Sequence, residues 1–168
     1  MPQRDEIGAD RLGRIVEDAA SEVYLFSADS FQFVLVNRGA RENLGYSMAE
    51  ISALTPWDLK PDIPREQFLK LIRPLLTKEC ERLDFETRHR RKDGTHYDVA
   101  VTLQLIDSDG IGLFYATIQD ITSQKFTERS LIEVSCRLDA ILGNTTMAIF
   151  MMEASQQCVF MNSAAEDP

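Results

Sequence analysis

The segment Gly112–Ile121 constrains the fold most, because it is a β-rich run that is apolar on both faces near its centre. One face carries Phe114, Ala116 and Ile118, and the other carries Leu113, Tyr115 and Thr117. A strand that is apolar on both faces must be covered on both. We therefore expect helices against one face of its sheet, and an N-terminal helix, a second subunit or both against the other.

Four further runs have the composition of strands. Residues 23–26 and 31–36 are rich in β-branched and aromatic side chains and form a predicted hairpin. Residues 83–91 and 97–104 alternate in polarity on either side of an Asp93-Gly94 turn, which is typical of a tight hairpin. With the last strand they make a meander that follows the first hairpin.

Short helices are predicted between the two groups of strands. Asn37–Leu44 ends at Gly45, a helix-terminating residue, and Ser47 with Glu50 forms a capping box for Met48–Leu54. A longer helix opens at Pro64 or Arg65, and Pro74 is expected to kink or end it. The whole order predicts an α+β fold, a five-stranded antiparallel sheet with short helices on one face. An amphipathic helix over Asp10–Ala20 precedes it.

Charge and composition exclude several classes of protein. The formal net charge of −9 argues against a nucleic-acid partner, because phosphate binding requires clustered Lys and Arg. No apolar run approaches the roughly 20 residues that span a bilayer, so we expect no membrane association. The three cysteines form no metal-binding or disulfide pattern, which favours a reducing, cytoplasmic location and no metal site.

Four short motifs follow one another between Tyr24 and Thr122. They are an asparagine after the second strand (Asn37), a Gly-Tyr-Ser step (45–47), a Lys-Asp-Gly turn (92–94) and an Asp-Ile-Thr ending (120–122). In this order and spacing, over about 100 residues, the segment resembles a PAS domain. The resemblance implies that Asp120 and Thr122 fasten the last strand to the start of the following helix, which in PAS proteins commonly couples the sensor to a downstream domain.

The chain also resembles itself. Leu25–Ala40 recurs as Phe150–Ala165, with Asn37 matching Asn162. We interpret the chain as an N-terminal helical cap (1–22), a PAS domain (23–122), a signalling helix (123–142) and the start of a second, incomplete PAS repeat (143–168). The alternative is a chance similarity between two short hairpins.

The predicted signalling helix carries a coiled-coil seam. Its seam positions, spaced 4, 3, 4, 3, are Thr127, Leu131, Val134, Leu138 and Ile141. Leu131, Val134, Leu138 and Ile141, with Leu113 and Tyr115 of the sheet, are therefore expected to hold a homodimer. The alternative is a lone amphipathic helix that folds back on its own sheet.

No residue constellation indicates catalysis, and we expect no enzymatic activity. The two histidines lack a nucleophilic partner, and no phosphate-binding loop is present. His89 shares the alternation of Phe85 and Thr87 and is predicted to be an inward, hydrogen-bonded structural histidine, whereas His96 is expected to be exposed. The basic run Arg88–Lys92 is interpreted as a solvated hairpin tip rather than an anion site.

The resemblance also bears on cofactors. Family members that bind haem usually present a histidine from the longest helix, and Arg65–Thr77 has none. The Asn-Cys-Arg-Phe-Leu-Gln motif of the flavin photoreceptors is absent as well. We expect neither haem nor a covalent chromophore, and Cys80 is interpreted as a core or surface cysteine. A non-covalent flavin remains an open alternative.

A pocket for a small, mostly apolar ligand is predicted between the helices and the sheet. Its expected lining is Leu25, Val34, Val36, Leu44, Trp57, Phe68, Leu69, Ile72, Phe85, Thr87, Val101, Leu103, Phe114 and Ala116, with Trp57 at the rim. The same residues would equally form a plain core. Two functions follow: a sensory, signal-input domain, or a ligand-free dimerisation module. The effector could be a histidine kinase, a cyclic-di-GMP enzyme or a chemoreceptor.

Overall fold

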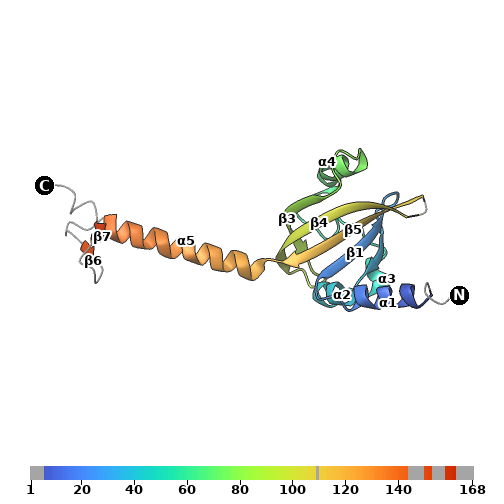
Figure 1. Ribbon diagram of the computed structural model, residues 1–168, viewed down its shortest axis with the longest axis horizontal. Helices are drawn as coiled ribbons and strands as arrows, with labels where there is room; N and C mark the ends of the chain where they lie inside the picture. The colour runs from blue at the N-terminus through green and yellow to red at the C-terminus, as the bar shows by residue number, and fades with distance from the viewer. Residues whose placement is uncertain (1–5, 109, 144–149, 153–157, 162–168) are drawn as a thin grey trace. The chain divides into compact units, whose positions relative to one another are not determined.

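The computed structural model describes residues 6–108, 110–143, 150–152 and 158–161 (Figure 1). Its elements are α1 (Glu6–Glu17), β1 (Glu22–Ser27), β2 (Phe33–Val36), α2 (Arg38–Leu44), α3 (Met48–Ile51), α4 (Arg65–Leu76), β3 (Leu83–Arg90), β4 (His96–Ser108), β5 (Ile111–Asp120), α5 (Thr122–Gly143), β6 (Phe150–Met152) and β7 (Cys158–Met161). They form two compact units, Met1–Thr122 and Ser123–Pro168.

The first unit is built on a five-stranded antiparallel sheet of order β2-β1-β5-β4-β3. β5 lies at the centre of the sheet, between β1 and β4. Phe114, Ala116 and Ile118 are buried, while Leu113 and Tyr115 on the opposite face are half-buried. The predicted α+β architecture is confirmed.

Asn37 joins three elements at one end of this sheet. Its Oδ1 accepts hydrogen bonds from the backbone N–H groups of Val23 (3.0 Å) and Ala40 (3.2 Å), so it caps α2 and binds β1. Its Nδ2 donates to the carbonyl oxygens of Val16, Ala19 and Ser21, at or just beyond the end of α1. The side chain is fully buried. A buried amide with all its hydrogen bonds satisfied fixes the geometry of the surrounding backbone.

The helix boundaries follow local signals. Gly45 ends α2 in the left-handed conformation (φ 78°), and its N–H donates to the carbonyl oxygen of Arg41. The capping box of Ser47 and Glu50 is present, but α3 ends at Ile51 rather than at the predicted Leu54. α4 continues two residues beyond Pro74, whose carbonyl oxygen accepts a hydrogen bond from the N–H of Glu79. α1 begins and ends earlier than the predicted Asp10–Ala20.

The second unit contains α5 and a small hairpin. β6 and β7 pair antiparallel, with Phe150 opposite Met161 and Met151 opposite Phe160. These strands fall where the sequence places the hairpin of a second repeat. Residues 144–149, 153–157 and 162–168, including Asn162, lie outside the described residues. The tandem-repeat interpretation stays a prediction.

Candidate functional site

The inner face of the sheet is the buried face that carries Tyr24, Val101 and Ala116. Tyr24 of β1 lies directly opposite Ala116 of β5, and Ala116 lies opposite Leu103 of β4. β3 adds Phe85, which lies opposite Val101. Ala116, on the central strand, therefore lies between larger side chains of β1 and β3. Because its side chain is only a methyl group, it leaves space above the middle of the sheet.

Two residues predicted to line the pocket do not lie on this face. Leu25 is opposite Tyr115 in the β1–β5 register, which places it on the outer face. Val34 is 56% exposed. The error arose because β1 is apolar at every position from Val23 to Phe26, so alternation alone did not decide which residues point inward. The inward residues of these strands are Tyr24, Phe26 and Phe33.

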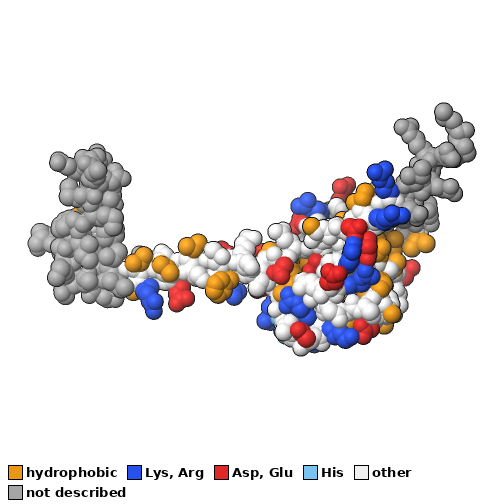
Figure 2. All heavy atoms as spheres, turned by 90° about the horizontal axis from the view of Figure 1, so that it is seen from below, with side chains coloured by type: hydrophobic (Ala, Val, Ile, Leu, Met, Phe, Trp, Pro, Cys, Tyr) orange, Lys and Arg blue, Asp and Glu red, His pale blue; other side chains and the backbone are white. Residues whose placement is uncertain are grey.

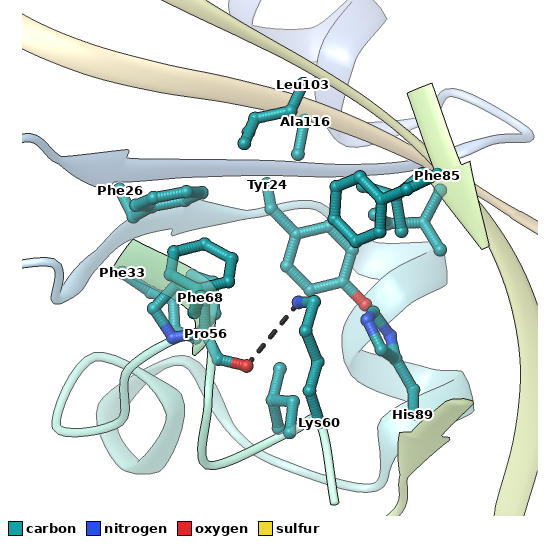
Figure 3. A pocket seen from close by; sticks show the side chains of 13 residues that line it. Tyr24, Phe26, Phe33, Pro56, Lys60, Phe68, Phe85, His89, Leu103 and Ala116 are labelled. Carbon is teal, nitrogen blue, oxygen red and sulfur yellow. Dashed lines mark hydrogen bonds between the residues drawn. The ribbon is translucent and has the colours of Figure 1, made fainter. Parts of the chain in front are cut away.

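A cavity of about 10 Å³ lies between the inner face, α4 and the α3–α4 connection (Figure 3). It is lined by Tyr24, Phe26, Phe33, Pro56, Leu59, Lys60, Phe68, Phe85, His89, Val101, Leu103, Ala116 and Ile118. A volume of this size is about what one water molecule requires. The core is therefore nearly filled, and a larger ligand requires side chains to move.

The remaining predicted lining residues are placed as follows. Phe68, Phe85, Val101, Leu103 and Ala116 line the cavity. Val36, Leu44, Ile72 and Phe114 are buried in the core without lining it, and Thr87 is buried with no hydrogen-bond partner for its Oγ1 within the described residues. Leu69 and Trp57 are half-buried against the core.

Aromatic rings form a large part of the cavity wall and of the core around it. Phe26 stacks on Phe114 with ring centroids 4.9 Å apart, and it meets the edge of Phe33 at 5.9 Å. Trp57 does not line the cavity, and its ring contacts Phe68 at 6.0 Å and Phe31 at 5.6 Å. Such ring pairs stabilise the packing beyond simple burial.

Lys60 brings a charged group into this apolar surrounding. It follows Leu59 in the α3–α4 connection and is only 6% exposed. Its Nζ donates one long hydrogen bond, 3.4 Å, to the carbonyl oxygen of Pro56, and lies 5.7 Å from the centroid of the Phe68 ring. Burial lowers the pKa of Lys60 from 10.5 to about 7. Nothing in the local sequence indicated an inward lysine here.

His89 belongs to β3, lines the same cavity and is 1% exposed. Its Nδ1 is 3.5 Å from the hydroxyl of Tyr97, and its Nε2 has no hydrogen-bond partner among the described residues. Burial, and then the nearby charge of Lys60, hold the pKa of His89 well below its ordinary value. The inward orientation of His89 was predicted correctly, but the expectation of a fully hydrogen-bonded histidine is wrong at Nε2.

The buried carboxylate of Glu22 holds the two tyrosine hydroxyls near His89 in place. Glu22 accepts hydrogen bonds from the hydroxyl of Tyr24 (2.7 Å), the hydroxyl of Tyr97 (3.1 Å) and Nδ2 of Asn43 (2.6 Å). Burial raises the pKa of Glu22, although these donors oppose the rise. Burial also raises the pKa of both tyrosines, with the charge of Glu22 as the next cause, so both hydroxyls stay protonated at neutral pH.

The end of β5 is fastened to β4. The N–H of Thr122 donates to Oδ1 of Asp120 at 2.9 Å, and Oγ1 of Thr122 accepts from the N–H of Asp98 at 3.0 Å. The N–H of Ile121 donates to the carbonyl oxygen of Asp98 at 2.9 Å. These bonds join the residue at which α5 begins to the same strands that line the cavity.

Apolar side chains are exposed along α5 (Figure 2). Leu131, Val134 and Leu138 of the predicted seam are each more than half exposed, and so are Phe126 and Ile132 outside the seam. The side chain of Ile141 lies outside the described part of the chain. On the sheet, Leu113 and Tyr115 are half-buried on the outer face.

The basic run Arg88–Lys92 is occupied by local partners. Arg88 makes two 2.7 Å hydrogen bonds to Asp62, and Lys92 pairs with Glu50 at 2.6 Å. Arg91 lies 4.2 Å from the ring centroid of Tyr97. These contacts attach the β3–β4 hairpin to the helical side, and Arg88, Arg90 and Lys92 remain exposed, as expected for a solvated hairpin tip. His96 is exposed, as expected.

Neither a metal site nor a membrane span is found in the part of the chain that the structure describes. No three His, Cys, Asp or Glu side chains there are grouped as ligands, and none of its helices combines the length and hydropathy needed to cross a bilayer.

Comparison with known proteins identifies the fold. A domain of an HTR-like protein from Haloarcula marismortui, described as a PAS domain, is 25% identical, with a TM-score of 0.60 over 69% of this chain and 93% of its own. A domain of a sensory box sensor histidine kinase/response regulator from Geobacter sulfurreducens is 18% identical (TM-score 0.57, 66% and 92% covered). An RNA-binding Light-Oxygen-Voltage receptor is 15% identical (TM-score 0.66, 79% and 38% covered).

Among curated protein sequences, none matches the chain significantly. The family model described as the PAS domain matches residues 21–123, which is more than half of the chain. This range contains all five strands of the sheet and every residue that lines the cavity. The chain therefore belongs to the PAS domain family.

Proposed function

We propose that this chain is a cytoplasmic signal-input module whose aromatic cavity binds a small, mostly apolar ligand and whose α5 helix transmits the binding event to an effector domain. A homodimer joined along α5 is part of this proposal. The effector remains a histidine kinase, a cyclic-di-GMP enzyme or a chemoreceptor, and no catalytic role is assigned to the chain itself.

One observation carries the proposal: a strand that lines the cavity, β5, is also the strand that leads into α5. Ala116 and Ile118 of β5 line the cavity, and β5 ends at Asp120, beside the hydrogen bonds of Thr122. A ligand that displaces β5 therefore acts on the start of α5 through two to four residues of strand. A coupling of about 1–3 kcal/mol is sufficient for such a signal, and each buried methylene of a ligand contributes about 0.8 kcal/mol.

The proposed role is that of an input domain within a larger signalling protein, and a domain with the same fold occurs in a sensor histidine kinase. The test is a thermal-shift screen of small apolar molecules, followed by hydrogen exchange on the chain with and without each hit. We expect a hit to raise the melting temperature and to change the exchange of the Asp98 and Thr122 amides. Binding that leaves both amides unchanged contradicts the coupling. An ultraviolet–visible spectrum of the purified chain checks for haem and flavin.

A ligand-free dimerisation module is the second candidate, and the small size of the cavity favours it. About 10 Å³ is available in the core, while the outer face of the sheet presents Leu25, Leu113 and Tyr115. Native mass spectrometry separates the two candidates. A dimer with no bound small molecule, together with no thermal shift from any ligand, favours the second.

A further inference from the structure

The cavity contains two polar groups that its packing leaves incompletely bonded. Lys60 has three N–H donors when charged, and the described residues offer its Nζ one hydrogen bond, at 3.4 Å. Nε2 of His89 has none. Both side chains are more than nine-tenths buried and both line the same cavity (Figure 3). Buried polar groups without partners are costly, and each requires an explanation, of which a bound water, ion or other ligand is one.

The hydrogen bonds of the Tyr97 hydroxyl determine whether Nε2 of His89 is a hydrogen-bond donor or an acceptor. The hydroxyl of Tyr97 is 3.1 Å from Oε2 of Glu22 and 3.5 Å from Nδ1 of His89. A hydrogen bond to a carboxylate is stronger than one to a neutral nitrogen, so this hydroxyl donates its proton to Glu22. Its oxygen then accepts from an Nδ1–H, and Nε2 remains a bare acceptor that faces the cavity. Lys60 supplies donors beside this acceptor.

A carboxylic acid complements this pair. Its carbonyl oxygen accepts from Nζ of Lys60, and its O–H donates to Nε2 of His89. If the proton moves from the acid to either side chain, the result is a carboxylate beside one buried cation, which is an ion pair rather than an isolated charge. An acid can therefore supply both hydrogen bonds in its neutral form and a compensating negative charge in its ionised form. A primary amide offers the same acceptor and donor but cannot form the ion pair, and a hydrocarbon offers neither.

The walls define the rest of the molecule. Apart from Lys60 and His89, the lining is apolar or aromatic (Figure 3), and the centroid of the Phe68 ring lies 5.7 Å from Nζ of Lys60. A ligand whose head group binds Lys60 and His89 therefore needs an apolar body. A second charged group on the ligand would find no partner among the lining residues. The volume of about 10 Å³ means that the side chain of Lys60 must move to admit the body. Lys60 belongs to the α3–α4 connection rather than to the sheet, and the carbonyl oxygen of its neighbour Leu59 accepts a hydrogen bond from the N–H of Arg90 in β3.

We propose that this cavity is a binding site for a small monocarboxylic acid with an apolar or aromatic body, held by Lys60 and His89. The inference rests on the proposed function, because it names the ligand class of the same cavity. It differs from that function in requiring a specific head group, so the two can fail separately.

The proposal predicts a pH dependence. Lys60 is half neutral near pH 7, so binding of a carboxylate above this pH requires the uptake of one proton. The affinity should then fall about tenfold per pH unit above 7. The other titratable groups behind the cavity are Tyr24, Tyr97 and Glu22, and the two tyrosines remain neutral in this range because burial raises their pKa. α4 presents Phe68 to the cavity.

The experiment uses matched probes on the 168-residue chain, with calorimetry or NMR titration from pH 6 to 9. Butyrate and benzoate are the acids, butyramide and benzamide are their neutral counterparts, and toluene is the hydrocarbon. We expect at least one acid to bind at least tenfold more tightly than its amide at pH 6.5 and to lose this advantage as the pH rises. Lys60→Met should remove the preference, and His89→Gln should reduce it.

The outcomes separate the two proposals. Equal binding of acids and amides, or an acid preference that persists in Lys60→Met and in His89→Gln, overturns the acid site and leaves the ligand-binding function in place. Failure of all five probes to bind overturns the acid site and counts against ligand binding by the cavity altogether. The wild-type pH series stands without any variant, so a destabilised His89→Gln does not prevent a decision.

Discussion

Oγ1 of Thr122 accepts a hydrogen bond from the backbone N–H of Asp98 at 3.0 Å, and the carbonyl oxygen of Asp98 accepts one from the N–H of Ile121. Both backbone groups of one residue in β4 are therefore bonded to the two residues that follow β5. This arrangement fixes Ile121 and Thr122, the residues that lead into α5, against β4 of the sheet that encloses the cavity. Any displacement of β5 must break or move these bonds.

Thr122→Val should loosen this junction without changing its shape. Valine replaces the hydroxyl by a methyl group of similar size, so the Asp98 N–H loses its acceptor. We expect the free energy of unfolding to fall by about 1 kcal/mol, the typical net contribution of one hydrogen bond, and the Asp98 amide to exchange faster. Chemical denaturation and hydrogen exchange measured by NMR give these two quantities.

Thr127→Val is the matched control. The hydroxyl of Thr127 donates to the carbonyl oxygen of Ser123 within α5, and it is exposed. This substitution should leave the exchange of the Asp98 amide unchanged. If both variants accelerate that exchange equally, the junction at Thr122 has no special role.

Lys60→Met should stabilise the protein, most strongly at and below pH 7. Folding lowers the pKa of Lys60 from 10.5 to about 7, so between these values the unfolded chain holds one more proton and the free energy of unfolding rises with pH. Methionine removes this dependence and the cost of burying the amine, on the order of 4 kcal/mol at low pH. Denaturation at pH 6.5, 8 and 9.5 should show the advantage of the variant shrinking as pH rises.

The exposed Lys70 on α4 supplies the control for this series. Lys70→Met should leave the free energy of unfolding nearly unchanged at each pH. Parallel pH curves for the wild type and Lys60→Met would show that the amine is solvated in the folded protein, contrary to its buried position.

Tyr97→Phe tests the carboxylate network. The substitution removes one of the three donors to Glu22 and the hydroxyl beside Nδ1 of His89. Because that donor lowers the pKa of Glu22, we expect this pKa to rise further, and the protein to lose about 1–2 kcal/mol of stability. The carboxyl carbon of Glu22 followed by NMR against pH reports the first quantity, and urea denaturation the second.

Tyr115→Phe is the control on the outer face of the sheet, since the hydroxyl of Tyr115 has no hydrogen bond within the described residues. It should change neither quantity appreciably. A pKa of Glu22 that is the same in Tyr97→Phe and in the wild type would place Tyr97 outside the network.

Features encoded by neighbouring residues were predicted well from the sequence. The Asp93-Gly94 turn, the capping box of Ser47 and Glu50 and the two-faced apolar pattern of β5 each depend on a few adjacent side chains, and each is present. Together with the order of strands, they were sufficient for the fold.

The cavity was predicted less well, because its composition depends on contacts between distant segments. Val23 to Phe26 is apolar throughout, so only the pairing with β5 decides that Tyr24 and not Leu25 faces inward. Lys60 lies in an irregular connection with no periodicity, and its burial follows from where Phe68 and the sheet place that connection. Its role could not be read from its neighbours in the chain.

The predicted coiled coil is tested by charge placed on the seam of α5. Leu131→Asp combined with Leu138→Asp should give a monomer in analytical ultracentrifugation, because two carboxylates at seam positions of each helix would face each other without cations. Ile132→Asp is the control, since Ile132 is 57% exposed, is as apolar as the seam leucines and lies off the seam. We expect this control to remain dimeric. A dimer that survives the double substitution removes α5 as the interface and leaves the outer face of the sheet, with Leu113 and Tyr115, as the surface to test next.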